Sequence, residues 1–410
     1  MSPTMRIPTL SLLLLAIAAL APAVLPAQGV GRICRALHSE GLEHLAYDRA
    51  ASHRLSRRQA AALRDTLTAA WRAGIARQTA RDWADRDIRI DSLHLRFDRR
   101  VYGTAPADGR SLYISMHGGG NTATAVNDQQ WENQKHLYKP AEGVYVAPRA
   151  PWDNWNMWFQ PGIDALFERL IAAAIVRDSV NPDKVYLLGY SAGGDGVWRM
   201  APRMADRWAA AAMMAGHPGE AEQVNLLHVP FMIWMGELDA AYDRNRLAAA
   251  KGRVMDSLQR ACPEGYVHET HIITGKGHWM ERQDTAAIAW MARYRRDPLP
   301  AHIVWRQEDV CRTAFYWLKV RPRDARHGMR VEVRLHPERG EVEILSSDYR
   351  RLTVCLNDDL LDLDRPVSIT HQGRVLFKGR LRRTAATMAR SLLELNDPRR
   401  CFTAEVEVEM

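Results

Sequence analysis

Short apolar runs that alternate with helix-like segments constrain this 410-residue chain more than any other feature. Such runs fit strands buried on both faces of a sheet. Because segments of helical spacing separate them, their order predicts an α/β fold, a mostly parallel sheet flanked by helices. The expected strands are Leu112–Met116, Gly143–Pro148, Val185–Gly189, Ala210–Gly216 and Phe231–Gly236, and the expected helices are Ile163–Val180, Ala192–Met204, Asn245–Arg260 and Glu281–Tyr294.

The segments on either side of this α/β region have a different character. Residues 28–85 are rich in alanine, leucine and arginine at helical spacing, which predicts a helical N-terminal extension. The α/β domain is assigned to residues 86–299 and opens with alternating apolar and polar residues, typical of strands with one solvated face. Residues 300–410 are predicted to form a separate, small β-rich domain with a hairpin at 331–344 and one helix near 384–395.

The N-terminus has the features of a secretory signal peptide. Arg6 precedes an apolar stretch from Leu12 to Leu20, and small residues follow around Ala27. The stretch is shorter than the roughly 20 residues that span a bilayer. We therefore expect cleavage of residues 1–27, export to the periplasm or the extracellular space, and no stable membrane anchor in the mature chain.

Composition excludes several kinds of partner and site. The formal net charge is +8, but the basic residues are scattered and no run interleaves them with aromatic residues, so we expect no nucleic acid partner. The cysteines match no metal-binding or disulfide framework, so no pairing and no metal site is assigned. Because their number is odd, at least one thiol is expected to be free; they are Cys34, Cys262, Cys311, Cys355 and Cys401.

The sequence 189–193, Gly-Tyr-Ser-Ala-Gly, matches G-x-S-x-G and lies between a buried strand and a helix, as that motif requires. A sharp turn there lifts the Ser191 hydroxyl above the sheet edge, and glycines two positions away let neighbouring backbone pass. Short motifs also match by chance, and a tight turn that uses glycine for packing is the alternative. A serine nucleophile needs an imidazole base and a carboxylate that orients it.

A candidate acid and a candidate base follow in the order Ser, acid, His that this architecture uses. Asp239 lies in the loop after the strand 231–236 and is the predicted triad acid, with Glu237 and Asp243 as alternates. Asp243 is also a candidate helix cap. His278 lies in a glycine-flanked loop after another strand-like run and is the predicted base. His268 and His271 fall inside that run and are expected to be structural.

Residues 117–120, His-Gly-Gly-Gly, follow the first buried strand and expose backbone N–H groups that can stabilise an oxyanion. One donor is expected from Gly118 or Gly119 and the other from Ala192, the residue after the nucleophile. A phosphate-binding loop is the alternative, but no GK[ST] follows and the glycine spacing is not G-x-G-x-x-G.

Together the stretches 117–120, 189–194, "GELDAAYDRN" and "GKGHW" resemble the α/β-hydrolase fold over about residues 87–297. Within that fold the chain resembles secreted esterases related to polyhydroxybutyrate depolymerases and dienelactone hydrolases. The C-terminal part is similar to the corresponding regions of bacterial phospholipase or carboxylesterase-like proteins. The resemblance implies hydrolysis without a cofactor, through an acyl-enzyme on Ser191 with Asp239 and His278. Dienelactone hydrolases proper use a cysteine nucleophile, so Ser191 favours ester hydrolysis.

Three tryptophans, Trp152, Trp155 and Trp158, occupy a loop at the carboxyl end of a predicted strand, where open α/β sheets bind ligands. They are predicted to contact a sugar, an aryl group or an acyl chain, with Trp131 and Trp279 as further candidates. The alternative is that they anchor a lid or the helical extension.

The sequence thus predicts a secreted serine hydrolase that cleaves small-molecule or polymeric carboxylic esters. Two alternatives stay open. One is a serine peptidase of the prolyl-oligopeptidase type, which shares the triad, and the other is a non-catalytic binding protein on the same fold.

Overall fold

The computed structural model describes residues 27–410, with side chains from residue 30, so the predicted signal peptide lies almost wholly outside the described residues. The main sheet contains β1 (Asp87–Ile90), β2 (Leu93–Tyr102), β3 (Arg110–Met116), β4 (Gly143–Pro148), β5 (Val180–Tyr190), β6 (Ala210–Met214), β7 (Phe231–Gly236) and β8 (His268–Ile273). Its helices are α4 (Thr124–Leu137), α5 (Ile163–Arg177), α6 (Ala192–Arg203), α7 (Arg244–Ala261) and α8 (Ala286–Met291).

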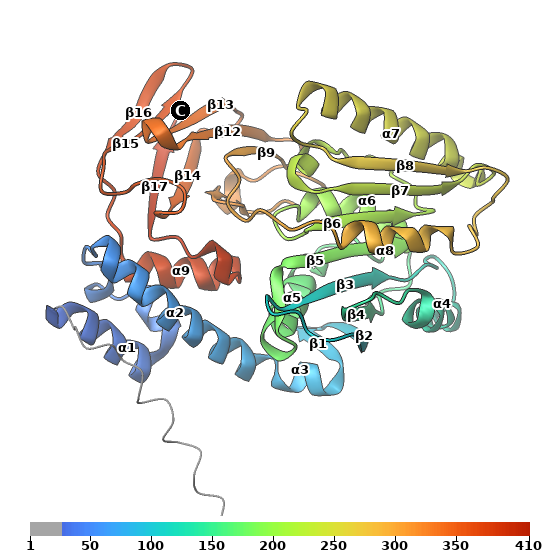
Figure 1. Cartoon of the computed structure of the whole chain (residues 1–410), viewed down its shortest axis with the longest axis horizontal. Coiled ribbons are helices and arrows are strands. Elements are labelled where there is room, and N and C mark those ends of the chain that lie inside the picture. Colours follow the sequence, from blue (N-terminus) through green and yellow to red (C-terminus); the bar gives the residue numbers. More distant parts are fainter. Residues whose placement is uncertain (1–26) are drawn as a thin grey trace, which may run out of the picture.

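This eight-stranded sheet has the order β1-β2-β4-β3-β5-β6-β7-β8. Only β1–β2 and β2–β4 pair antiparallel, and every other pair is parallel. The helices lie on both sides of the sheet (Figure 1). The predicted α/β-hydrolase fold is therefore confirmed, and the five predicted strands correspond to β3–β7.

Side chains alternate between the two faces of the sheet because successive strand residues point to opposite sides. On one face the strands contribute aliphatic residues such as Ile114, Leu187 and Ile233 to a core shared with α5, α6 and α7. On the other face larger residues, among them Tyr186 and Trp234, pack with side chains of α4 and α8. Both faces of the main sheet are buried, which explains the unbroken apolar runs of the sequence.

The remaining elements lie beside the sheet. The helical extension consists of α1 (Ala27–Leu45), α2 (Arg57–Gln78) and α3 (Ala80–Asp85). The C-terminal region has two small sheets, ordered β10-β11-β14-β17 and β16-β15-β13-β12-β9. Its elements are β9 (His302–Arg306), β10 (Ala314–Phe315), β11 (Leu318–Lys319), β12 (Arg330–His336), β13 (Glu341–Ser347), β14 (Arg351–Leu356), β15 (Val367–His371), β16 (Arg374–Gly379), α9 (Ala385–Leu395) and β17 (Ala404–Glu409).

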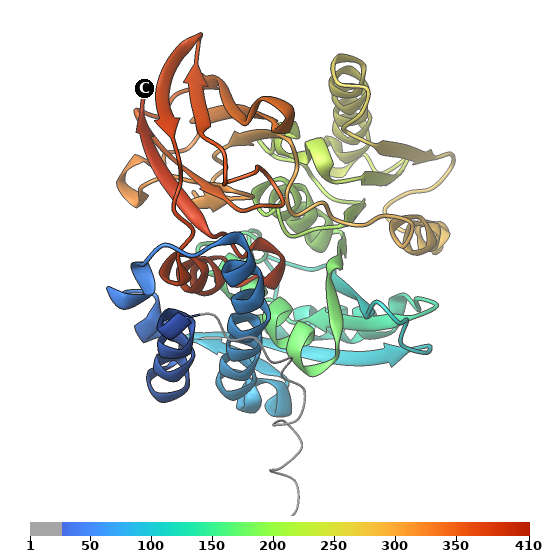
Figure 2. The ribbon, with the colours of Figure 1, turned by 60° about the vertical axis from the view of Figure 1, so that its left-hand side comes forward.

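The C-terminal region packs against the N-terminal extension. The helix predicted near 384–395 is α9, and it lies beside α1 and α2 of the N-terminal extension (Figures 1 and 2). One continuous hydrophobic core joins these helices, the two small sheets and one face of the main sheet. The helical extension and the C-terminal region therefore pack as one body with the α/β region.

One predicted helix is wrong in extent. The helix expected over 281–294 is reduced to a 3₁₀ turn, Gln283–Thr285, followed by α8. Glu281 and Arg282 have positive φ angles of 52° and 65°, a conformation that ends helices and that non-glycine residues rarely adopt. Nothing in the sequence marks those two residues for that conformation.

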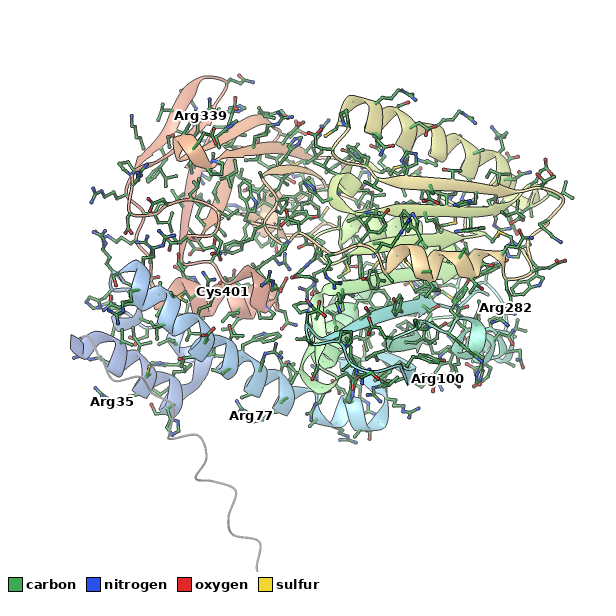
Figure 3. All side chains as sticks on the ribbon, viewed as in Figure 1. Arg35, Arg77, Arg100, Arg282, Arg339 and Cys401 are labelled. Atoms are coloured by element: carbon green, nitrogen blue, oxygen red, sulfur yellow. The ribbon has the colours of Figure 1, made fainter. Side chains whose placement is uncertain are left out.

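Surface arginine side chains are dispersed over the molecule (Figure 3), and the cysteines are unpaired. Figure 3 shows Arg35, Arg77, Arg100, Arg282 and Arg339 on separate parts of the molecule. All five cysteines are free thiols. Among residues 27–410 no helix is both long and apolar enough to cross a bilayer.

Candidate active site

Ser191 occupies the sharp turn between β5 and α6. Its φ and ψ are 58° and −122°, a strained conformation for a residue with a side chain. A Cβ atom on Gly189 would overlap the carbonyl of Gly193, and one on Gly193 would overlap the carbonyl of Met116. The two glycines are therefore required by close backbone packing, and the Ser191 N–H is held by the Met214 carbonyl at 2.9 Å.

The three residues predicted as a triad lie together. The Nε2 atom of His278 is 2.9 Å from the Ser191 Oγ, and its Nδ1 atom is 2.7 Å from Oδ2 of Asp239. In the tautomer that fits this arrangement, Nδ1–H donates to the carboxylate and Nε2 accepts from the serine hydroxyl. The Asp239 side chain is 2% exposed and that of His278 is 43% exposed, so the base faces solvent while the acid is shielded.

Two adjacent loops bring the acid and the base together. Asp239 follows β7 and His278 follows β8, and the Leu238 N–H donates to the Lys276 carbonyl at 2.8 Å. Gly236 at the end of β7 leaves room for the backbone of Gly277, which a Cβ atom would overlap. Because β7 and β8 are parallel neighbours, their carboxyl ends place both loops at one sheet edge.

The alternate acids have other contacts. The Glu237 carboxylate accepts the Gly275 N–H at 2.8 Å. Asp243 precedes α7, but its side chain makes no capping bond and instead pairs with Arg246 at 2.8 Å. Neither carboxylate contacts the His278 ring, so the geometry selects Asp239.

The glycine loop lies against the nucleophile. A Cβ atom on Gly118 would be 3.1 Å from that of Ser191. The Gly120 N–H donates to Oδ1 of Asn127 at 2.7 Å. By contrast, the N–H groups of Gly118, Gly119 and Ala192 donate to no other residue in the described part of the chain. They are thus available to a ligand oxygen beside Ser191, although no bound ligand defines which of them such an oxygen would meet.

His117 supports this loop from inside the protein. Its side chain is buried, Nδ1 is 2.6 Å from the Gly118 carbonyl and Nε2 accepts the Ala150 N–H at 3.1 Å. Burial lowers the pKa of His117 to about 3, although its bond to the Gly118 carbonyl opposes the shift. The ring is therefore a very weak base, and because its Nε2 lone pair already accepts the Ala150 N–H, His117 cannot replace His278 as a base near pH 7.

The three tryptophans of the loop differ in exposure. The Trp155 side chain is 62% exposed, and its backbone lies beside Gly120. Trp152 is half-buried against the main core. Trp158 is fully buried and donates its Nε1–H to the His117 carbonyl at 2.9 Å, so the prediction that it contacts substrate is wrong for this conformation. Trp158 instead supports the glycine loop from the protein interior, through its bond to the His117 carbonyl.

Two further tryptophans were candidates for the same wall. Trp279, next to His278, is 50% exposed. Trp131 lies on α4, where its ring packs under Lys135 and its Nε1–H donates to the Ala147 carbonyl of β4. Two other exposed apolar side chains, Leu238 and Tyr242, lie in the Asp239 loop.

Three residues near the triad or its glycine loop were not predicted from the sequence. Asn127 holds the glycine loop, and Tyr190, the variable residue before the nucleophile, contacts the His278 backbone. Asp195, one helical turn after Ser191, accepts the His217 N–H at 2.6 Å. Burial raises the pKa of Asp195 to about 6. Periodicity indicates which faces of α4 and α6 are buried but not these long-range partners.

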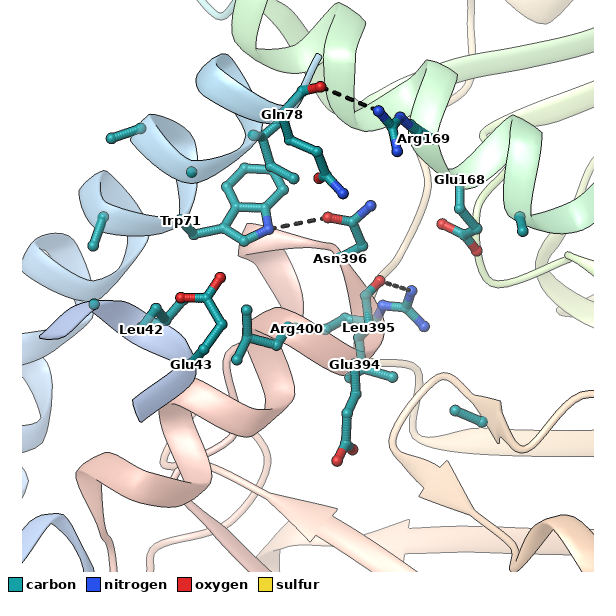
Figure 4. Close-up of a pocket in the computed structure, with 18 of the residues that line it drawn as sticks. Leu42, Glu43, Trp71, Gln78, Glu168, Arg169, Glu394, Leu395, Asn396 and Arg400 are labelled. Carbon is teal, nitrogen blue, oxygen red and sulfur yellow. Dashed lines mark hydrogen bonds between the residues drawn. The ribbon is translucent and has the colours of Figure 1, made fainter. Parts of the chain in front are cut away.

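A large cavity of about 1480 Å³ lies away from the triad (Figure 4). It is bounded by α1, α2, α5, α9 and residues 310–314, and polar side chains such as Glu168, Asn396 and Arg400 share its lining with Leu42 and Trp71. Within residues 27–410 no cluster of three or more histidine, cysteine, aspartate or glutamate side chains is arranged to hold a metal ion.

Comparison with known proteins gives structural likenesses only, because no family model and no curated protein matches the chain. A thermostable esterase is 16% identical with a TM-score of 0.41, over 51% of this chain and 62% of that protein. A dienelactone hydrolase from Anabaena variabilis is 16% identical with a TM-score of 0.36, over 51% and 96%. An alpha-beta serine hydrolase homologue from Coxiella burnetii is 13% identical with a TM-score of 0.34, over 50% and 94%. At these values the chemistry has to be argued from the side chains.

Proposed function

We propose that this protein is a serine hydrolase that cleaves carboxylic esters through a covalent acyl-enzyme. The observation that carries the proposal is the chain of hydrogen bonds from Ser191 through His278 to Asp239, beside unengaged backbone N–H groups. Serine alone is a weak nucleophile, and this arrangement supplies the base, its orienting carboxylate and an oxyanion site.

The first half-reaction forms the acyl-enzyme. His278 Nε2 takes the Ser191 proton while Oγ attacks the acyl carbon, and the carbonyl oxygen becomes an oxyanion facing Ala192 N–H and that of Gly118 or Gly119. The carbon–oxygen ester bond then breaks, and His278 gives its proton to the departing alkoxide. Asp239 stabilises the transient imidazolium and stays ionised.

The second half-reaction releases the acid. His278 takes a proton from a water molecule that attacks the acyl carbon, and the bond to Ser191 Oγ breaks as His278 returns the proton to it. No oxidant, reductant or cofactor enters this balance. His278 has access to water because its side chain is 43% exposed.

The exposed apolar side chains around the triad support an ester with an apolar or aromatic part. Trp155, Leu238, Tyr242 and Trp279 belong to the loops that carry the triad or lie next to the oxyanion loop. Such side chains bury aryl, acyl or sugar faces. A panel of acetylated xylan, feruloylated sugars, lipid esters and hydroxyalkanoate polymer would identify the ester class, small or polymeric. Export belongs to the same proposal, and the N-terminal sequence of the mature protein tests it.

The test of the function compares wild type with Ser191→Ala on short-chain aryl esters. We expect the variant to lose about 10⁴-fold or more in kcat/KM, because the nucleophile is removed while the fold stays intact. Ser257→Ala is the matched control, since that exposed hydroxyl on α7 donates to the Arg253 carbonyl and accepts from Arg260, both within its own helix. Equal rates for wild type and Ser191→Ala would overturn the proposal.

The two alternatives give different results in the same assays. A peptidase would cleave matched anilides as well as esters, because His278 would protonate an amine leaving group. A non-catalytic binding protein would show no Ser191-dependent turnover and no covalent adduct with an organophosphonate.

A further inference from the structure

Tyr190 joins the nucleophile turn to the loop that carries His278. It is the residue immediately before Ser191, and its hydroxyl donates to the His278 carbonyl at 2.6 Å. The same hydroxyl accepts the Met280 N–H at 3.1 Å. One side chain therefore uses both its donor and its acceptor on backbone groups on either side of Trp279.

The ring of Tyr190 adds packing to these bonds. It meets the His278 imidazole edge to face, with centroids 6.0 Å apart and planes at 79°. It also lies against Trp279 at 5.6 Å. The side chain is buried in the core on the α4 and α8 face of the sheet. Burial raises the pKa of Tyr190 well above its usual value, so the hydroxyl keeps its proton and remains a donor throughout the pH range of the proposed reaction.

The loop itself needs such a constraint. Gly275 has a φ of 71°, and added Cβ atoms on Gly275 or Gly277 would meet no neighbouring atom within 4 Å. Neither glycine therefore has a side chain that packs against a neighbour, and backbone contacts have to hold this segment. Its first half is held to the Asp239 loop through the Leu238 N–H, which donates to the Lys276 carbonyl. Tyr190 holds the second half, at the residue that bears the imidazole.

We infer that Tyr190 is a positioning residue that keeps His278 between Ser191 and Asp239. The inference rests on the proposed function. Because Tyr190 and Ser191 are consecutive, the turn that fixes the nucleophile also fixes the residue that holds the base. The distance of 2.9 Å between Ser191 Oγ and His278 Nε2 is thereby maintained although the His278 loop is rich in glycine. A misplacement of about 1 Å in such a pair can cost roughly 100-fold in rate.

Tyr190→Phe tests this role, and Tyr186→Phe is its matched control. Tyr186 lies on the same strand and face, is also buried, and donates its hydroxyl to the Tyr294 carbonyl at 2.9 Å. Each variant removes one hydroxyl from a backbone carbonyl and keeps the ring. Tyr190→Phe also removes the acceptor of the Met280 N–H, so urea unfolding of the full chain measures the stability of each variant separately.

We expect Tyr190→Phe to lower kcat on a short-chain aryl ester about 10- to 100-fold with KM changed less than about threefold, because general base catalysis is weakened. Tyr186→Phe should stay within about twofold of wild type. Equal losses in the two variants, or no loss in Tyr190→Phe, would overturn the role.

A second readout does not depend on turnover. The hydrogen-bonded Nδ1 proton of His278 should give a downfield NMR signal, which Asp239→Asn would identify by its disappearance. In Tyr190→Phe this signal should broaden or vanish through exchange, and in Tyr186→Phe it should persist. An unchanged signal in Tyr190→Phe contradicts the inference even if wild type proves inactive, whereas inactivity of wild type alone overturns only the proposed function.

Discussion

Charged side chains pair in two contrasting regions. One is the open edge of the main sheet, where Asp239 contacts His278. The other is the buried junction between the helices of that sheet and the C-terminal region, centred on Asp397. At the edge, His278 is partly exposed and contacts a single carboxylate. At the junction, Asp397 is inaccessible to solvent. Its Oδ2 atom lies 2.6 Å from a guanidinium nitrogen of Arg296, 2.9 Å from one of Arg400 and 3.2 Å from one of Arg207. At the edge, polar groups remain available to a ligand, whereas at the junction the charged side chains pair with one another.

Asp397, which is buried, and Asp195, which is half-buried, make the difference clear. Burial alone would raise the pKa of Asp397, but Arg296, Arg400 and Arg207 outweigh it and hold that pKa well below the usual range. Burial raises the pKa of Asp195 to about 6, because Asp195 forms no ion pair with any residue between 27 and 410. Cationic partners within contact distance, more than depth, decide which form of a carboxyl the fold stabilises.

The junction also explains why the C-terminal region is not a loose appendage. Asp397 follows α9, whereas Arg207 follows α6 and Arg296 follows α8, so these pairs cross from the C-terminal region to the α/β region. Arg203 on the nucleophile helix likewise pairs with Asp309, 3.0 Å away in the segment after β9. The helix that follows Ser191 is thus held in place by the C-terminal region.

The largest expected effect is at the edge. Asp239→Asn should lower kcat/KM about 10⁴-fold, because an amide favours the wrong imidazole tautomer and does not stabilise the imidazolium. Steady-state kinetics on an aryl ester measures this loss. The controls are Glu237→Gln and Asp243→Asn from the same loop, which should stay within a few-fold of wild type. A comparable loss in either control would mean that the assignment of the acid is wrong.

The next effect is at the junction and concerns stability. Asp397→Asn leaves three arginines without their shared anion, which typically costs about 3 to 5 kcal/mol of unfolding free energy. Because the folded pKa of Asp397 is depressed, its contribution is present above the unfolded pKa of about 3.9 and is lost as the pH falls below that value.

Urea unfolding at several pH values measures this effect. The difference between wild type and Asp397→Asn should be full at pH 7 and shrink below about pH 4. Glu409→Gln, which removes a charge from an exposed pair with Arg350, serves as the control for a surface pair and should change the midpoint little. A difference between wild type and Asp397→Asn that does not vary with pH would refute the electrostatic explanation.

The edge was more predictable from the sequence than the junction. The turn at Ser191 is encoded locally by a strand, a helix and two glycines, and parallel strand order brings the ends of β5, β7 and β8 to one edge. The structure therefore places Ser191, Asp239 and His278 together as the sequence suggests. Their catalytic roles remain the subject of the proposed experiments.

Contacts made by single side chains across the fold could not be predicted. Tyr190 meets a carbonyl 88 residues away, and no local pattern indicates such a partner. Three tryptophans in one loop look equivalent, but the turns of that loop expose Trp155 and bury Trp158. The arginines of the junction appear in the sequence as scattered charge, because their pairing exists only after α6, α8 and α9 have packed.

The smallest expected effect compares the two carboxyls directly. Asp195→Asn keeps an oxygen that can accept the His217 N–H and removes a charge that burial disfavours. Because the folded pKa of about 6 exceeds the unfolded value of about 3.9, stability due to protonated Asp195 is present below pH 4 and is lost as the pH rises through 6. The asparagine variant should escape that loss. Two pKa units correspond to about 3 kcal/mol, and since Asp195 is only half-buried we expect a gain of about 1 to 2 kcal/mol at pH 8.

This gain should be absent at pH 4, where wild type carries a neutral carboxyl as well, and urea unfolding at the two pH values distinguishes the cases. Asp195→Asn and Asp397→Asn are the same chemical change, yet the first should stabilise the protein and the second should destabilise it. Loss of stability at pH 8 in Asp195→Asn would show that Arg244, His278 and Arg199, the charged neighbours that lower the Asp195 pKa, stabilise its carboxylate more than burial disfavours it. Asp195 would then belong with the junction carboxylates, and the contrast between the two regions would not extend to the nucleophile helix.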